Sequence, residues 1–263
     1  MTGVFQTRLP YDTGAQKPLP GISPLGEAHW LMRDEAFAGQ MAERDRLLRD
    51  RRDAVLAMDA GAGPAAEELL DAVLAAEYPG ATDRVTRPDG VVVAIDRGDP
   101  MGTLGRLVQE DLCILEKRGD EHVLTAAALC FPASWTLAEK FMRPLIAIHR
   151  PVAEYDDMLA RRVQRLFDGV QPGRPLWRFN VLNYARPDLH QPLSESAKPD
   201  LRRDGPMPYL RSERQCILRL PVTRAVVFTI HTFVLRRTEA AAGTGAAAGT
   251  GAAAGTGDDA PPT

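Results

Sequence analysis

Residues 209–235 read YLRSERQCILRLPVTRAVVFTIHTFVL, and two long runs in this stretch are rich in branched and aromatic side chains. The first run covers residues 209–220 and the second covers residues 225–235. Apolar residues that recur every second position, bounded by a proline and polar residues, are typical of β-strands. The stretch therefore predicts one strand over Tyr209–Leu220 and another over Ala225–Leu235.

Four more segments upstream are similarly rich in branched or apolar residues. Leu176–Tyr184 predicts a strand, and so does the short Val91–Ile95. Asp111–Lys117 and His122–Phe131 are two apolar runs separated by the turn-like residues 118–121, which predicts a hairpin. The sheet expected from these runs is mostly antiparallel.

Helices are expected mainly in the first half of the chain. The predicted helices cover Asp34–Met58, Ala65–Tyr78, Met101–Gln109, a short segment beginning near Trp135, and Pro151–Phe167. Their apolar residues recur at spacings that one helical face allows, and Thr136 with Glu139 has the spacing of a capping box. Helices followed by antiparallel strands indicate an α+β fold rather than a regularly alternating α/β fold.

Both ends of the chain differ in composition from its middle. Residues 1–30 are rich in proline and glycine and predict an extended N-terminal arm over the core. Residues 239–263 contain three AAAGTG repeats and no large apolar side chain, which predicts a disordered tail. Residues 31–238, between these two segments, are expected to form a single α+β domain.

Composition excludes several classes of protein. The chain has 263 residues with 32 Lys and Arg against 35 Asp and Glu, a balance that argues against a nucleic-acid partner. No apolar run reaches the ~20 residues that a membrane-spanning helix needs, so no membrane association is expected. The number and spacing of the three cysteines argue against a disulfide framework and against a CxxC metal site. The N-terminal residues have no secretory-signal pattern, so a cytoplasmic protein is expected. Zinc-protease, nucleophile-elbow and glycine-rich phosphate motifs do not occur.

Two histidines are candidates for a role in a site. His149 ends the apolar run Leu145–Ile148 and precedes Arg150–Pro151, where a helix is expected to begin. An imidazole at that junction suits an axial haem ligand, and it equally suits a histidine that hydrogen-bonds a helix end. His231 lies inside the strand predicted over residues 225–235 and points either into the core or away from it.

The segment RSERQ at residues 211–215 places ionic and amide groups in an otherwise strand-like run. Alternation puts Arg211, Glu213 and Gln215 on one face and Arg214 on the other. Such a ladder can clamp carboxylates, such as haem propionates, or form a structural ion-pair network. The segment WRFN at residues 177–180 offers another arginine and amide beside aromatic rings.

Several motifs resemble, in order, those of one known family. They are QEDLCIL at 109–115, LCFPASW at 129–135, IHRPV at 148–152, RFN at 178–180, RSERQ at 211–215, LP at 220–221 and FTI at 228–230. In this order they resemble the haem-dependent oxidative N-demethylase alpha-subunit family, over about residues 10–234.

The resemblance implies a PAS-like haem-binding fold and a particular reaction. A small N-methylated amine, such as dimethylamine, would be oxidised by dioxygen to the demethylated amine and formaldehyde. The implied cofactor is haem b, and the electrons would come from separate flavin and iron–sulfur partner proteins. His149 matches the family's Ile-His-x-Pro-Val motif and is expected to be the proximal iron ligand. The residues expected to contact the cofactor are Arg178, Asn180, Arg211, Glu213, Arg214, Gln215 and His231.

Two positions depart from the family pattern. The family commonly has tryptophan where this chain has Val181, and arginine where it has His231. The substrate is therefore left open. Two other hypotheses stand beside the enzyme: a haem-binding sensor or carrier without turnover, and a cofactor-free interaction protein in which the same polar motifs brace the sheet.

Overall fold

The computed structural model describes residues 4–149, 157–197 and 206–237. The side chains of His149 and Asp157, at the borders of one gap, are also outside the description. The predicted disordered tail and the first residues of the helix predicted over Pro151–Phe167 fall outside these ranges.

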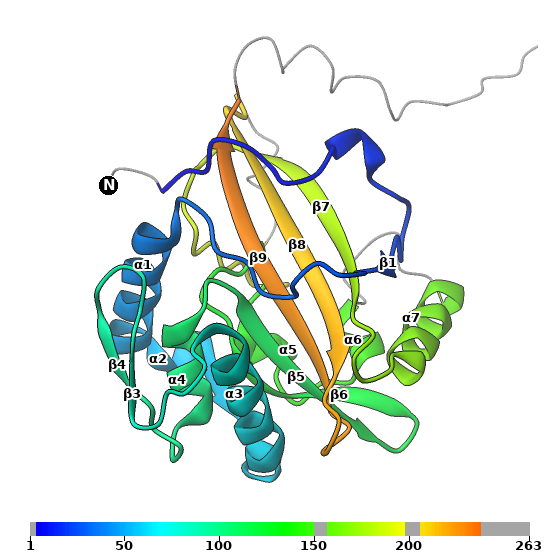
Figure 1. The fold of residues 1–263 in the computed structure, drawn as a ribbon. Helices are drawn as coiled ribbons and strands as arrows, with labels where there is room; N and C mark the ends of the chain where they lie inside the picture. Colours follow the sequence, from blue (N-terminus) through cyan, green and yellow to red (C-terminus); the bar gives the residue numbers. More distant parts are fainter. Residues whose placement is uncertain (1–3, 150–156, 198–205, 238–263) are drawn as a thin grey trace, which may run out of the picture.

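One antiparallel sheet dominates the described part of the chain (Figure 1). Its strand order is β1-β7-β8-β9-β5-β6-β2, and each neighbouring pair is antiparallel. The strands are β1 (Ser23–Pro24), β2 (Leu56–Met58), β5 (Asp111–Arg118), β6 (Glu121–Ala128), β7 (Leu176–Tyr184), β8 (Tyr209–Arg219) and β9 (Val226–Arg236). A separate small hairpin joins β3 (Arg84–Thr86) to β4 (Val92–Ala94).

Short and medium helices surround this sheet. They are α1 (Phe37–Asp50), α2 (Arg52–Val55), α3 (Gly63–Glu77), α4 (Pro100–Leu107), α5 (Leu137–Lys140), α6 (Leu145–His149) and α7 (Asp157–Gly169), with 3-10 turns η1 (Thr13–Ala15) and η2 (Ala60–Ala62). Local sequence explains several of their starts. Asp99 caps α4 by accepting a hydrogen bond from the amide of Gly102, and Pro100 fills its first turn. With an antiparallel sheet and these helices, the predicted α+β fold is confirmed.

The first face of the sheet is covered by α3, α4 and the N-terminal arm. Leu112, Ile114 and Val227 point to this face and pack in one buried cluster with Leu69 and Leu104. Residues 4–36 cross β8 and β9 on this side before α1 begins (Figure 1). We call this side the arm face.

The second face is covered by α5, α6 and α7. Cys113, Ile217 and Ile230 point to this face, where they pack with Leu145 from α6 and Phe167 from α7. Because side chains alternate along a strand, each long strand serves both faces with every second residue. We call this side the helix face.

The helix predicted over Asp34–Met58 is wrong in its extent. Helix α1 begins at Phe37 and ends at Asp50, because Arg51 has a non-helical backbone with φ −141° and ψ 36°. After the short α2, Leu56–Met58 is a strand that pairs with residues 126–128 of β6. Tertiary pairing at the sheet edge outweighs the helical spacing of the apolar residues.

The other predicted elements agree with the structure to within a few residues, and the hairpin of β5 and β6 is present. Strands β1 and β3 were not predicted, since each has only two or three residues. No helix in the described ranges is both long and apolar enough to cross a membrane.

Candidate functional site

Strand register brings two distant polar motifs together on the helix face. Arg178 lies opposite Gln215, and Asn180 lies opposite Glu213, on the paired strands β7 and β8. Gln215 and Glu213 face the same way as Ile217, which packs in the helix-face cluster. The prediction that Arg211, Glu213 and Gln215 share one face, with Arg214 on the other, agrees with this register.

These side chains form a hydrogen-bonded ladder along the helix face. Arg178 donates from Nη1 to Oε1 of Gln215 at 2.8 Å. Gln215 Nε2 and Asn180 Nδ2 each donate to Oε2 of Glu213 at 3.0 Å. The other carboxylate oxygen of Glu213, Oε1, lies 3.9 Å from Nε of Arg211 and has no hydrogen bond with a described residue. The ladder thus fixes one oxygen of Glu213 and leaves the other able to accept.

Several buried polar atoms on this face have no hydrogen-bond partner in the described part of the chain. They are Nε of Arg178, Nε of Arg211 and the hydroxyl of Tyr184. Burial lowers the pKa of Arg178, and the attraction of Glu213 only partly opposes that effect. Leaving a buried donor unpaired costs about 1–3 kcal/mol, so a water or a ligand that bonds to one of these atoms would stabilise the protein.

Arg211 has a second role in positioning nearby loops. Its guanidinium donates to the carbonyl of Leu189 at 3.0 Å and to that of Phe131 at 2.6 Å. Both carbonyls belong to segments that follow strands, β7 and β6 respectively. Arg211 therefore ties two loops to the sheet while its Nε is left without a partner.

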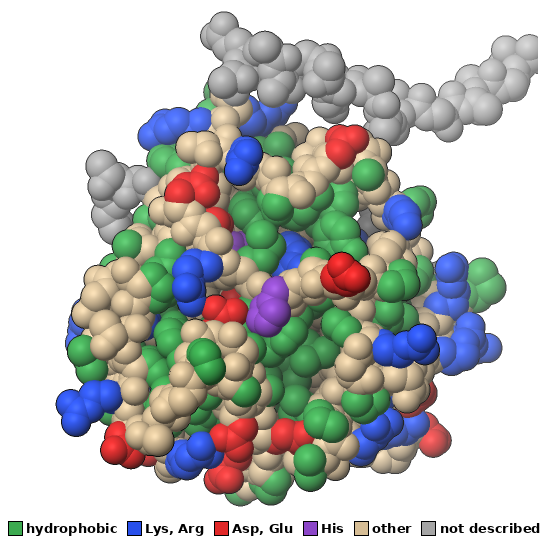
Figure 2. Space-filling model, in the orientation of Figure 1, with side chains coloured by type: hydrophobic (Ala, Val, Ile, Leu, Met, Phe, Trp, Pro, Cys, Tyr) green, Lys and Arg blue, Asp and Glu red, His purple; other side chains and the backbone are tan. Residues whose placement is uncertain are grey.

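A cavity of about 490 Å³ opens at the edge of this face, beside β7. It is lined by Gln16, Lys17, Pro18, Leu19, Met158, Leu159, Arg162 and Arg178. Among the described residues, the lining contains cationic groups from the arm, from α7 and from β7, and no acidic side chain. Figure 2 shows Lys and Arg side chains gathered at the edge of the molecule where α7 lies. The cavity therefore favours an anionic ligand.

Helix α6 lies on the same side of the sheet and ends at His149. Ile148 packs against the helix-face cluster that contains Ile217 and Phe228. Lys140 Nζ donates to the carbonyl of Ile148 at 2.6 Å and also pairs with Glu195, which anchors the last turn of α6. The backbone of His149 is therefore on the helix face, while its side chain is outside the described residues.

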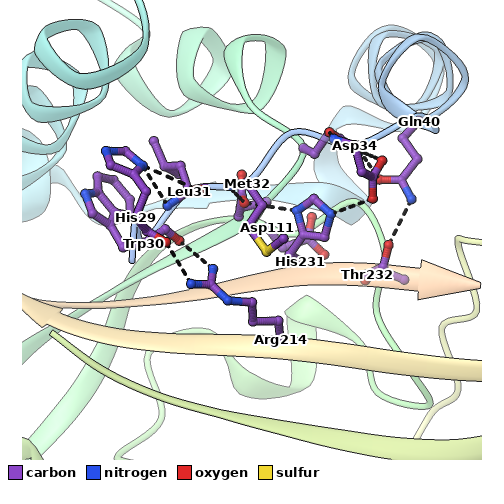
Figure 3. Close-up of polar contacts among 12 residues, drawn as sticks. His29, Trp30, Leu31, Met32, Asp34, Gln40, Asp111, Arg214, His231 and Thr232 are labelled. Atoms are coloured by element: carbon purple, nitrogen blue, oxygen red, sulfur yellow. Dashed lines mark hydrogen bonds and ion pairs between the residues drawn. The ribbon is translucent and has the colours of Figure 1, made fainter. Parts of the chain in front are cut away.

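On the arm face, His231 occupies a fully buried position between two carboxylates (Figure 3). Nε2 lies 3.0 Å from Oδ2 of Asp34, and Nδ1 lies 3.0 Å from Oε1 of Glu110. Burial alone would lower its pKa, but the hydrogen bonds to Asp34 and Glu110 outweigh burial and raise the pKa to about 9. Burial would raise the pKa of Asp34, whereas His231 holds it at about 2. His231 is therefore a cation at neutral pH.

Arg214 lies directly opposite His231 on the paired strands β8 and β9. It donates to the carbonyl of His29 at 2.7 Å and to that of Trp30 at 3.3 Å, as Figure 3 shows. Glu110 in turn accepts from the amide of Met32 at 2.7 Å. These contacts hold residues 29–34 of the arm against the sheet.

The predicted site residues therefore separate into two groups. Arg178, Asn180, Arg211, Glu213 and Gln215 share the helix face, which also carries α6. Arg214 and His231 lie on the opposite face, covered by the arm. The sequence interpretation missed Lys17, Arg162 and Tyr184. Tyr184 had a usable signal, because it ends a predicted strand at even spacing from Arg178.

The comparison with known families agrees with the motifs in the sequence. The sequence model for "Haem-dependent oxidative N-demethylase, alpha subunit-like" matches residues 21–250. This range contains both strand motifs of the ladder, helix α6 and the predicted ligand His149. The match covers most of the chain, and the chain therefore belongs to the haem-dependent oxidative N-demethylase, alpha subunit-like family.

Proposed function

We propose that this chain is the haem-binding subunit of an oxidative N-demethylase, with the cofactor bound at the helix face. The observation that carries this proposal is the guanidinium of Arg178. It borders the cavity, its Nε is buried without a partner, and no described carboxylate lies within ion-pair distance of it. Family membership supports haem as the ligand that meets it.

The chemistry of the cavity fits the acid groups of haem. Arginine binds carboxylates through planar, charge-assisted hydrogen bonds. The lowered pKa of Arg178 reflects the cost of burying an unpaired cation, and a bound carboxylate would offset that cost. The cavity volume of about 490 Å³ lies in the usual range for small-molecule sites.

His149 is our assignment for the iron ligand. A neutral imidazole supplies the nitrogen lone pair that haem iron takes on its proximal side. Helix α6 packs on the helix face, and Lys140 anchors its last turn directly before His149. This placement of the backbone supports the assignment that the family motif implies.

Glu213 has a charge that suits the amine rather than the cofactor. A carboxylate repels the propionates of haem, but it accepts hydrogen bonds from a protonated amine. Asn180 and Gln215 orient its Oε2, which leaves Oε1 to accept. We therefore assign Arg178 to the cofactor and Glu213 to the ammonium group of the substrate. Arg214 and His231, by contrast, are assigned to holding the arm.

The proposed reaction consumes one N-methyl amine, one dioxygen, two electrons and two protons, and it gives the demethylated amine, formaldehyde and one water. Haem, when bound, supplies the iron centre that activates dioxygen. In this assignment, Arg178 binds the carboxylates of the haem, and Glu213 orients the amine. Separate flavin and iron–sulfur partner proteins in the cytoplasm would supply the electrons. We also propose that the fold is PAS-like.

Amine-dependent oxygen consumption tests this function. Protein reconstituted with haem and supplied with a ferredoxin, a flavin reductase and NADPH should release formaldehyde only when a secondary or tertiary methylamine is present, in an amount equal to the oxygen consumed above the amine-free background. Glu213→Gln should lower kcat/KM at least about 30-fold, mainly through KM, because a charge partner of the amine is lost. Glu121→Gln, at the turn between β5 and β6, is the matched control.

Haem binding without formaldehyde release across a panel of methylamines would contradict the enzyme and favour the sensor. A protein that folds but binds no haem would favour the cofactor-free interaction protein. Equal kinetic constants for wild type and Glu213→Gln would contradict only the assignment of Glu213.

A further inference from the structure

The N-terminal arm forms one wall of the cavity at the helix face. Residues 16–19 line it, between η1 and β1. Both flanks of this short segment are fixed to the body of the protein. Ser23 and Pro24 pair with Trp177 and Leu176 of β7, and the amide of Leu25 donates to the carbonyl of Pro175 at 2.9 Å. On the other flank, the hydroxyl of Tyr11 lies 2.7 Å from Oγ of Ser212 in β8.

Lys17 is the cation that the arm brings to this cavity. Its Nζ donates to Oγ of Ser23 at 2.9 Å, which leaves further donor capacity on the ammonium group. The carboxylate of Asp12 borders a neighbouring smaller hollow of about 310 Å³, together with Lys17, but it does not line the larger cavity. In the described part of the chain, Lys17 has no ion pair within 4.0 Å.

Arg162 faces the same cavity from α7. On this helix Met158, Arg161, Arg162 and Arg165 recur at the spacing of one outer face, and these side chains are exposed. Among them, Met158 and Arg162 border the cavity, whereas Arg161 and Arg165 do not. Arg162 has no carboxylate partner among the described residues.

The cavity thus joins three cations from three segments that are far apart in the sequence. Arg178 lies on β7, Arg162 on α7 and Lys17 on the arm, and none of the described residues that line the cavity is acidic. Like charges that converge repel one another, and a dianionic ligand would reduce that repulsion. Leu19, Met158 and Leu159 supply apolar surface at the same place.

We propose that Lys17 and Arg162 bind the two carboxylates of the cofactor together with Arg178, so that the arm closes over the acid edge of the haem. This inference rests on the proposed function, because it takes haem as the dianion. It makes the arm a part of the cofactor site, in addition to its role in covering the sheet.

A titration with haemin and with its dimethyl ester tests this proposal. Lys17→Gln and Arg162→Gln should each weaken haemin binding about 5-fold, and together about 25-fold, as expected for partly exposed ion pairs. The ester lacks the two negative charges, so its affinity should be the same for wild type and both variants within about twofold. Binding is followed by the Soret band, which does not depend on turnover.

Arg165→Gln is the matched control, since Arg165 is exposed on the same helix but does not line the cavity. It should bind haemin as wild type does. Circular dichroism of each variant checks that the fold is kept, as expected for exposed positions.

Equal haemin affinity for wild type and the double variant would overturn this proposal alone. An equal loss with the ester would also overturn it, because the loss would then not involve the carboxylates. Failure of wild type to bind haemin at all would overturn the proposed function and this inference together.

Discussion

On the neighbouring strands β7, β8 and β9, charged side chains have different surroundings on the two faces of the sheet. On the arm face, His231 is bonded to two carboxylates, and Arg214 donates to two backbone carbonyls. On the helix face, Arg178 has a buried Nε without a partner and no described carboxylate beside it. Arg178, Arg214 and His231 lie on the three adjacent strands β7, β8 and β9, so neighbouring strands carry cations that serve different purposes.

This difference distinguishes residues that stabilise the fold from residues that are placed to bind a ligand. A buried cation with two partners contributes to stability, since removing it strands the opposite charges. A buried cation without a partner costs stability, since its desolvation is not offset. Substitutions on the two faces should therefore change the free energy of unfolding in opposite directions.

The largest effect is expected at His231. His231→Leu leaves the carboxylates of Asp34 and Glu110 buried without their shared cation, so the free energy of unfolding should fall by about 3–5 kcal/mol. Urea denaturation measures this loss. His29→Leu is the control, because half of the His29 side chain is exposed, and it should cost less than about 1 kcal/mol. Equal losses for the two variants would contradict the role of the buried triad.

The stability of wild type should also depend on pH through this triad. The pKa of His231 is raised to about 9 from 6.5, so its contribution is complete below pH 6.5 and is lost as the pH rises through 9. The loss should reach about 3 kcal/mol. The pKa of Asp34 is lowered to about 2 from 3.8, so its contribution is lost as the pH falls from 3.8 through 2. Unfolding by urea between pH 6 and 10 measures the alkaline loss.

His231→Gln tests the source of that alkaline loss. This variant cannot gain the charge at residue 231, so its stability should change much less between pH 6 and 10. The same alkaline slope in wild type and in His231→Gln would contradict the assignment to His231.

A smaller effect of opposite sign is expected for the two arginines. Arg178→Met removes a half-buried cation that has no carboxylate partner among the described residues, and it should raise the stability of the haem-free protein by about 1 kcal/mol, while haemin affinity falls about 10-fold. Arg214→Met removes a cation that is bonded to the carbonyls of His29 and Trp30, and it should cost about 2 kcal/mol. Thermal unfolding and Soret titration measure the two effects. Loss of stability in both variants would remove the distinction between the faces.

The smallest effect is expected for Tyr184→Phe. The hydroxyl of Tyr184 is buried without a described partner, so its removal should raise the stability of the haem-free protein by up to about 1 kcal/mol. Tyr11→Phe, on the arm face, is the comparison, because the hydroxyl of Tyr11 lies 2.7 Å from Oγ of Ser212. That variant should lose about 1 kcal/mol in the same denaturation experiment.

The local sequence was sufficient to predict the long strands and to predict which side chains share a face of the sheet. The period of two in residues 209–215 depends only on strand geometry, so it placed Arg214 apart from Glu213. The local sequence was not sufficient to predict short elements such as Leu56–Met58, which forms a strand because it pairs with β6.

Contacts between distant segments could not be predicted from local patterns. His231 meets Asp34 and Glu110, which lie 197 and 121 residues away along the chain. Lys17 reaches the cavity only because β1 pairs with β7. Both depend on how the arm folds back over the sheet, and no spacing in the sequence encodes that path. The role of His149 stays a prediction.

The visible absorption spectrum of the purified protein with added haemin tests the central claim most directly. The account predicts a stoichiometric Soret band that shifts on reduction with dithionite and again with carbon monoxide. His149→Ala should lose most of this band while its circular dichroism is unchanged. A well-folded wild type without a Soret band would contradict the claim that the helix face holds haem, and full haem retention in His149→Ala would contradict the ligand assignment.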